Sequence, residues 1–275
     1  MNGHTLRAGT AEAVKRVDAE RRQDHRPQQG QRAAGRPSPP FEPPSRLAQF
    51  GRTLVLVPHP DDETIGCGGV LALLGRAGAA VQVVLVTEGD GSHRHSRDYP
   101  ALQLRALRRR EIEAALRELG HGPRCLVSLG LPDGAVPAAS EPGFEALVKR
   151  LARITRHFQP DTVLMPTHDD AHPDHRATCA AGAAACRLAA PDACRLEYPV
   201  WPGETREREA VQFDITAALA DKQRALAQHR SQLGLVVQDD PHGFILPPEL
   251  LARCALPVET FFYGQKEPPE TIDRR

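Results

Sequence analysis

The chain has 275 residues, of which 40% are hydrophobic and 25% charged, proportions that are typical of a soluble globular protein. This length allows one large domain or two small ones. Basic and acidic residues number 35 each, so the formal net charge is zero. A strong basic field that would attract nucleic acid is therefore not expected.

Membrane and secretory signals are not found in the sequence. No apolar run reaches the roughly 18 residues that a membrane-spanning helix needs, and the N-terminus lacks the apolar stretch of a secretory signal. The six cysteines form no CxxC pair and stand mostly in apolar surroundings, which favours buried free thiols over a disulfide framework. We therefore expect a cytoplasmic protein.

Residues 1–48 differ in composition from the rest of the chain. They are rich in Arg, Gln, Gly and Pro and poor in large apolar residues, so they cannot bury enough surface to offset the entropy of ordering. We expect a disordered or mobile extension, with an interaction tail as the alternative. Residues 49–275 are expected to form a single domain.

Beyond residue 53 the pattern alternates between short apolar runs and amphipathic stretches. The expected strands are 54–57, 81–86, 125–128, 162–165, 195–200, 211–213 and 259–263. The expected helices are a stretch ending near 76, 101–119, 144–158, 177–189 and 217–232. Strands that alternate with helices predict an α/β fold in three layers with a mostly parallel sheet.

The segment 58–63 (PHPDDE) directly follows the first expected strand. Ligand chemistry gathers at the carboxyl ends of strands in an open α/β sheet, and the two prolines restrict the backbone of this loop. Adjacent aspartates can point in different directions, so one of Asp61 and Asp62 is expected to bind a metal and the other a bound water. The alternative, that both only cap the next helix, leaves His59 unexplained.

A second polar segment, 167–175 (THDDAHPDH), follows the strand expected at 162–165. His172 and His175 are three residues apart at the start of a helix, so they lie on neighbouring positions of one helix face. One of them can bind a metal while the other reaches toward a substrate. Together the two segments supply two histidines and an aspartate for a catalytic zinc, with a carboxylate and an imidazole left for amide hydrolysis.

These motifs resemble those of the LmbE-like, or PIG-L, family of zinc-dependent N-deacetylases. The resemblance rests on PHPDDE at 58–63 and HPDH at 172–175, with weaker similarity between about residues 53 and 188. It implies a Rossmann-like three-layer αβα sandwich. It also implies that zinc is bound by His59, Asp62 and His175, although Fe²⁺ or Co²⁺ can occupy such a site.

The resemblance also assigns roles to other residues. Asp61 is expected to be the general base, and His172 to stabilise the developing oxyanion. Asp174 is expected to orient His172 and to raise its pKa. Arg108 and Asp133 match positions that hold the hydroxyl or attached groups of a sugar.

The last two assignments have structural alternatives. Arg108 stands in an arginine-rich run, and the alternative is that it belongs to a solvated, charged helix face. Asp133 stands in a Pro-Asp-Gly sequence, and the alternative is that it is only a turn residue. Some relatives carry an aromatic residue where this chain has Asp170. The substrate contacts of the family are therefore not transferred in detail.

The implied activity is hydrolysis of the N-acetyl amide of an N-acetylglucosamine-type sugar or glycoconjugate. An amidase that removes a larger acyl group, of the thiol-conjugate or lipoglycopeptide type, is one alternative. A non-catalytic sugar- or metal-binding module is another, but the presence of both Asp61 and His172 argues against it. The expected partner is the N-acetylated substrate, without nucleic acid or a membrane span, and no oligomeric state is predicted.

Overall fold

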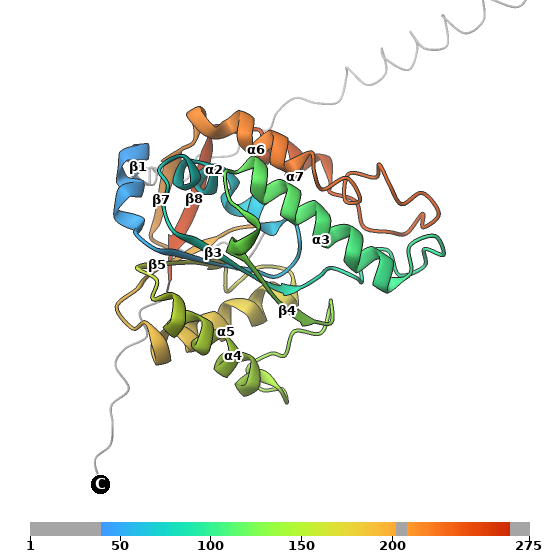
Figure 1. Cartoon of the computed structure of the whole chain (residues 1–275), viewed down its shortest axis with the longest axis horizontal. Helices are drawn as coiled ribbons and strands as arrows, with labels where there is room; N and C mark the ends of the chain where they lie inside the picture. The colour runs from blue at the N-terminus through green and yellow to red at the C-terminus, as the bar shows by residue number, and fades with distance from the viewer. Residues whose placement is uncertain (1–39, 202–207, 265–275) are drawn as a thin grey trace, which may run out of the picture. The chain divides into compact units, whose positions relative to one another are not determined.

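The computed structural model describes residues 40–201 and 208–264, all of which belong to one compact unit, residues 39–275 (Figure 1). Its strands form one sheet in the order β1-β7-β8-β6-β5-β2-β3-β4. The strands are β1 Phe41–Glu42, β2 Thr53–Val57, β3 Val81–Thr87, β4 Leu126–Leu131, β5 Thr162–Pro166, β6 Cys194–Tyr198, β7 Ala210–Asp214 and β8 Val258–Tyr263. Neighbouring strands are parallel except where β8 pairs with β6 and β7.

Helices cover both faces of this sheet, as Figure 1 shows. The helices are α2 Asp62–Arg76, α3 Ala101–Glu118, α4 Phe144–Phe158, α5 Pro173–Ala189, α6 Leu219–Leu226 and α7 Pro248–Cys254, with short 3-10 turns at η1 Pro44–Phe50, η2 Pro123–Cys125 and η3 Thr216–Ala218. The group α2, α3 and α6 packs on one face, and α4 and α5 pack on the other. The expected three-layer α/β fold is confirmed. None of the helices in the described part is both long and apolar enough to cross a bilayer.

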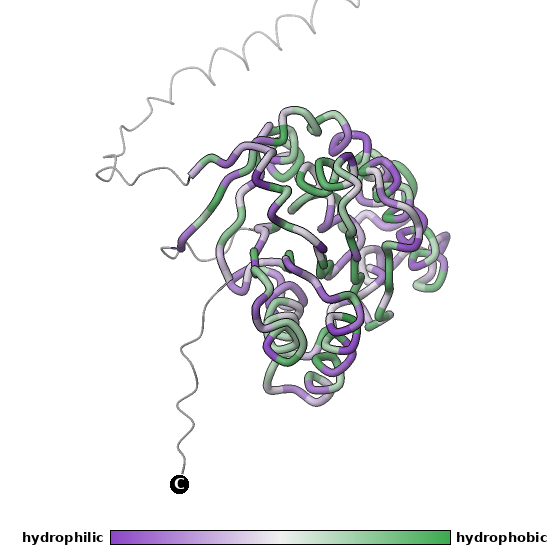
Figure 2. The backbone as a smooth tube through the Cα atoms, turned by 60° about the vertical axis from the view of Figure 1, so that its left-hand side comes forward, coloured by the Kyte–Doolittle hydropathy of each residue, from purple (hydrophilic) through white to green (hydrophobic). Residues whose placement is uncertain are grey.

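The central strands are buried on both faces, which explains their nearly continuous apolar sequence. Successive residues of a strand point to opposite faces, so each strand feeds both cores. Val55, Val57 and Val83 pack toward α2, whereas Leu54 and Leu56 pack toward α4 and α5. In Figure 2, green and purple alternate along the flanking helices, as expected for helices with one face on the sheet.

The strand order reverses between β2 and β5. From β2 the chain moves outward through β3 to β4, and β5 and β6 then continue on the other side of β2. The two strands pair in parallel, with Thr53 opposite Thr162 and Val55 opposite Leu164. Such a switch point opens a crevice at the carboxyl ends of the strands. The PHPDDE and HPDH segments follow β2 and β5 on the side of this crevice, so they lie at the same edge of the sheet.

Two expected boundaries are wrong. Residues 40–48 of the expected extension belong to the fold, because β1 pairs with β7 and Leu47 of η1 is buried in the core. The rest of the expected extension, residues 1–39, lies outside the described part. The helix expected at 217–232 ends at Leu226. Beyond it the chain turns, and His229 and Ser231 are buried against carboxylates of α2 and α3.

Helix α2 contains a break, and a buried ion pair forms hydrogen bonds with the backbone groups on both sides of it. Cys67 is non-helical, with φ of −146°, which leaves backbone groups on both sides without helical partners. Glu259 of β8 accepts the N–H groups of Gly69 (2.7 Å) and Val70 (2.9 Å). Lys222 of α6 donates to the Ile65 carbonyl (3.1 Å) and to Glu259 (2.6 Å).

Replacing Lys222 by methionine should lower the free energy of unfolding by about 3–5 kcal/mol, because it leaves the Glu259 charge buried without its cation. Urea unfolding followed by circular dichroism measures the change. Lys149→Met, on the exposed face of α4, is the control and should change stability by less than about 0.5 kcal/mol. Equal losses in the two variants would contradict a buried pair of this importance.

Candidate metal centre and active site

The loop that leaves β2 holds Asp61 in a strained backbone conformation, with φ of 128°. A residue with a side chain rarely adopts this angle, and such strain collects at functional sites. The Asp61 N–H donates to Glu63 Oε2 (3.1 Å), and its carbonyl accepts the N–H of Thr64 (3.0 Å). The loop is therefore fixed at the start of α2, with the Asp61 side chain lining the pocket at the crevice.

Three side-chain atoms form a nearly equilateral triangle at the switch point. His59 Nδ1 lies 3.3 Å from Asp62 Oδ2 and 3.2 Å from His175 Nε2, and the third side is also 3.2 Å. Ligands of a tetrahedral zinc at roughly 2.0–2.1 Å stand roughly 3.3–3.4 Å apart. The triangle therefore fits one zinc ion with a fourth position open.

His172 lies close to this triangle but is tied to the backbone. Its ring offers a nitrogen within 4.8 Å of the ligand atoms of His59 and His175. Its Nδ1 accepts the N–H of Asp174 (3.2 Å), which leaves the proton of a neutral ring on Nε2. Burial, together with the neighbouring His59 and His175, lowers the pKa of His172. Asp174 raises this pKa as expected, but burial and the two histidines outweigh it, so the net pKa is lowered and His172 is suited to be a neutral donor.

Asp174 has a different partner from the one expected. Its Oδ2 lies 3.1 Å from His59 Nε2 and accepts the N–H of Gly134 (2.8 Å), while Oδ1 accepts the N–H of Val136 (3.2 Å). The turn that follows β4 therefore turns the carboxylate toward His59 rather than toward the ring of His172. The expectation that Asp174 orients His172 holds only through its backbone N–H.

Asp133 also reaches His59. Its Oδ1 lies 3.1 Å from His59 Nε2, and its Oδ2 accepts the N–H of Gly91 (2.9 Å). Burial raises the pKa of Asp133, but the bond to His59 outweighs it, so the pKa is lowered. A carboxylate on the outer nitrogen of a metal-bound histidine fixes the ring and increases its basicity. Asp133 lines the pocket as well, so contact with a sugar stays a prediction.

Asp170 is a site residue that sequence analysis missed. Its buried Oδ2 lies 3.2 Å from His175 Nδ1 and accepts the Trp201 N–H (3.0 Å), while Oδ1 accepts the His172 N–H (2.8 Å). It therefore contacts a candidate ligand histidine and anchors one wall of the pocket. The available signal was its place in the histidine-rich loop, five residues before His175.

Asp61 has a pKa near neutrality and lies beside a buried arginine. Burial raises its pKa to about 7, opposed by Arg108 and assisted by Asp62. Arg108 is buried rather than solvated: it donates to the carbonyls of Pro60 (2.6 Å) and Gly89 (2.9 Å) and lies 3.4 Å from Asp61 Oδ2. Gly89 permits this approach, because a Cβ there would lie 2.1 Å from the guanidinium. Arg108 also lines the pocket.

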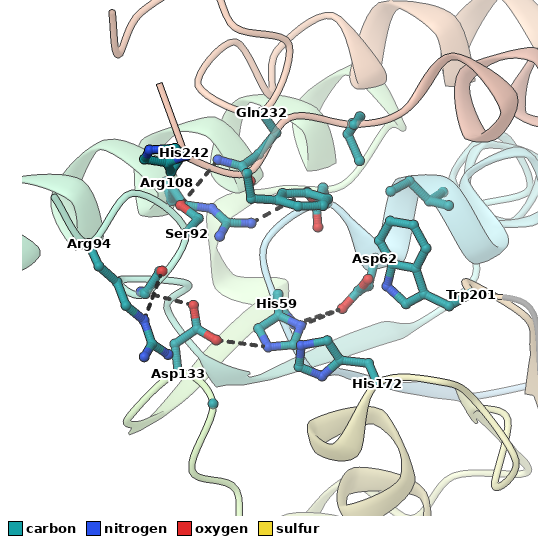
Figure 3. Close-up of a pocket in the computed structure, with 16 residues that line it drawn as sticks. His59, Asp62, Ser92, Arg94, Arg108, Asp133, His172, Trp201, Gln232 and His242 are labelled. Carbon is teal, nitrogen blue, oxygen red and sulfur yellow. Dashed lines mark hydrogen bonds and ion pairs between the residues drawn. The ribbon is translucent and has the colours of Figure 1, made fainter. Parts of the chain in front are cut away.

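A cavity of about 330 Å³ is lined by His59 and Asp62 of the triangle (Figure 3). One wall is apolar and includes Trp201, which meets Phe244 edge to face at 5.8 Å. The other wall is polar and includes Arg94 and Asp133. Gln232 also lines the cavity, and its buried Oε1 has no hydrogen-bond partner among the described residues. No role was expected for Gln232 from the sequence, which placed it in the helix expected at 217–232.

The amino-acid sequence is similar to known proteins over the region that builds this site. Residues 54–186 match the PIG-L family, described as GlcNAc-PI de-N-acetylase. The chain therefore contains a PIG-L, or LmbE-like, domain over residues 54–186. The resemblance expected from the two motifs is thereby confirmed.

Individual relatives of this family are deacetylases. The chain is 32% identical over 169 residues to a 1D-myo-inositol 2-acetamido-2-deoxy-alpha-D-glucopyranoside deacetylase of Rhodococcus erythropolis, covering 53% of the chain and 58% of the relative. It is 31% identical over 135 residues to a 2'-N-acetylparomamine deacetylase of Streptomyces fradiae, covering 46% and 48%. The chain spans 36–58% of the length of the curated relatives it matches.

The fold is also similar to that of a solved deacetylase. The N,N'-diacetylchitobiose deacetylase of Pyrococcus horikoshii, complexed with its inhibitor MPG, superposes with a TM-score of 0.56 at 26% sequence identity. The match covers 76% of this chain and 75% of the other. The similarity therefore extends beyond the region matched to the family.

Metal affinity of this site should rise with pH. Burial lowers the pKa of both histidines, but Asp133 and Asp174 raise that of His59 well above its ordinary value, and Asp62 and Asp170 raise that of His175 to about 9. Both rings are therefore in the doubly protonated, positively charged form at neutral pH. A metal must displace the proton from the nitrogen that binds it. Affinity should fall by roughly tenfold per pH unit for each proton displaced as the pH drops from about 9 to 6. Chelator competition measures this; a flat profile would contradict it.

Replacing Asp170 by asparagine should weaken metal affinity by roughly 10- to 100-fold, because the charge behind His175 is lost while the side-chain shape is kept. Metal titration against a chromophoric chelator measures the change. The neighbouring Asp169→Asn is a matched control, since Asp169 pairs with Arg208 (3.4 Å) rather than with a ligand histidine. If both variants bind metal equally well, Asp170 does not support the site.

Proposed function

We propose that the chain is a metal-dependent deacetylase that hydrolyses the N-acetyl amide of an N-acetylglucosamine-type sugar or glycoconjugate to acetate and a free amine. The observation that carries this proposal is the triangle of His59, Asp62 and His175, with Asp61 and His172 lining the same cavity. Zinc held there would supply a Lewis acid and lower the pKa of water to about 7.

The chain's own residues provide the proton transfers. Asp61, with a pKa of about 7, is partly ionised at neutral pH and accepts the proton of the attacking water. The Nε2–H of His172 donates to the amide oxygen as it gains negative charge, an interaction worth roughly 3–4 kcal/mol at such a site. The carbon–nitrogen bond then breaks, and protonated Asp61 returns its proton to the departing amine.

The walls of the cavity support an amino-sugar substrate. The orphan Oε1 of Gln232 needs a donor, which an amide N–H or a sugar hydroxyl supplies. The indole of Trp201 offers an apolar face to the ring carbons. Arg108 and Asp133 are largely occupied with Asp61 and His59, so their proposed part in binding is to present their remaining edges to the sugar.

The relatives narrow the substrate class of the proposal. Those compared above are named as deacetylases of N-acetylated sugars and aminoglycosides. Among the described residues that line the cavity, none specifies a larger acyl group, so acetyl remains the acyl group proposed to be removed. The metal proposed is zinc, which the His/Asp/His donor set accepts along with Fe²⁺ or Co²⁺. The cytoplasmic location also stays a prediction.

Acetate release from a panel of N-acetylated sugars and glycoconjugates tests this function on the zinc-loaded protein. Asp61→Asn should lower the rate by at least about 100-fold, because it removes the base without changing the shape of the site. Asp169→Asn is the matched control and should retain the rate. Release that survives both Asp61→Asn and chelation would contradict the proposal, whereas release of only longer acyl chains would identify an amidase of the second class.

A further inference from the structure

One buried carboxylate links the proposed general base to a distant turn of the chain. Glu63 is fully buried in α2, next to the site. Its Oε2 accepts the N–H of Asp61 (3.1 Å), and its Oε1 lies 3.0 Å from His229 Nε2 and accepts the hydroxyl of Thr64 (2.6 Å). The two oxygens thus face opposite ways, toward the loop of the base and toward the segment that follows α6.

The segment 229–232 is held in the interior by polar contacts. Glu111 of α3 accepts both the N–H and the hydroxyl of Ser231, at 2.7 and 2.6 Å. His229, Ser231 and Gln232 are each fully buried. This turn delivers the Gln232 side chain to the cavity. Glu63 therefore contacts Asp61 directly, and through His229 it contacts the turn that carries Gln232.

We propose that Glu63 and His229 form a buried positioning pair that holds Asp61 in its strained conformation and keeps the Gln232 turn beside it. The inference rests on the proposed function for the role of Asp61 as base. Neither Glu63 nor His229 is among the residues that line the cavity, so both act through Asp61 rather than on the substrate.

The physical reason lies in strain and burial. A residue at φ of 128° keeps that conformation only where its surroundings over-determine it. The Glu63 side chain can hold the Asp61 N–H in place only if its other oxygen is itself fixed, and His229 Nε2, 3.0 Å from Oε1, is a partner that fixes it. Removing His229 should therefore loosen Asp61 without touching a metal ligand.

The test compares two substitutions of His229 in the zinc-loaded protein. His229→Leu removes the nitrogen that faces Glu63 and should lower kcat for acetate release by roughly 10- to 100-fold, with KM and zinc stoichiometry little changed. His229→Gln restores a donor and should recover most of kcat. Lys222→Met, which breaks the other buried pair along α2, is the control for lost stability and should keep kcat.

A double-mutant cycle asks whether His229 acts through Glu63. If it does, adding His229→Leu to Glu63→Gln should cost little further kcat, because the link is already broken. If the fold-losses in kcat of the two single variants multiply in the double variant, His229 does not act through Glu63. Loss of kcat in His229→Leu that His229→Gln does not rescue, or that Lys222→Met reproduces, would overturn the positioning role.

Hydrogen exchange at the Asp61 amide separates this inference from the proposed function. His229→Leu should speed exchange there at least tenfold relative to Lys222→Met, whether or not the enzyme releases acetate from the substrates tried. Faster exchange in an inactive protein would support the positioning pair while the proposed function fails. Unchanged exchange would overturn the pair, even in a protein that proves to be an active deacetylase.

Discussion

The parallel pairing of β2 with β5 is the constraint on which the site depends. His59 and Asp62 follow β2, and His175 lies in the first turn of α5 after β5. Residues more than a hundred positions apart therefore meet because these strands are neighbours. The order of the sheet reverses at the same place, which opens the crevice above them. Ligand spacing of 3.2–3.3 Å is thus a consequence of strand register as much as of the motifs.

Buried carboxylates organise the layer behind the ligands. Asp133 and Asp174 lie on the outer nitrogen of His59, and Asp170 lies on that of His175. Each is itself held by backbone N–H groups of a neighbouring loop. The negative charge gathered here suits a divalent cation, and in its absence it favours protonated histidines. The same carboxylates therefore favour both metal binding and protonation of the histidines, and the two compete.

Much of the fold and of the candidate site was predictable from the sequence, because both depend on local patterns. Apolar runs marked the strands, and two short motifs at strand ends marked His59, Asp62 and His175. The partner of Asp174 was not predictable, since it depends on how the turn after β4 folds over α5. Gln232 was missed for a related reason: its helix ends early to satisfy contacts that only the tertiary structure supplies.

The most direct test of this account is the anomalous scattering of zinc in crystals of the metal-loaded protein. The account predicts one peak within roughly 2.0–2.2 Å of His59 Nδ1, Asp62 Oδ2 and His175 Nε2, with the fourth position facing the cavity. A peak bound by His172, or one placed among His59, Asp133 and Asp174, would contradict it.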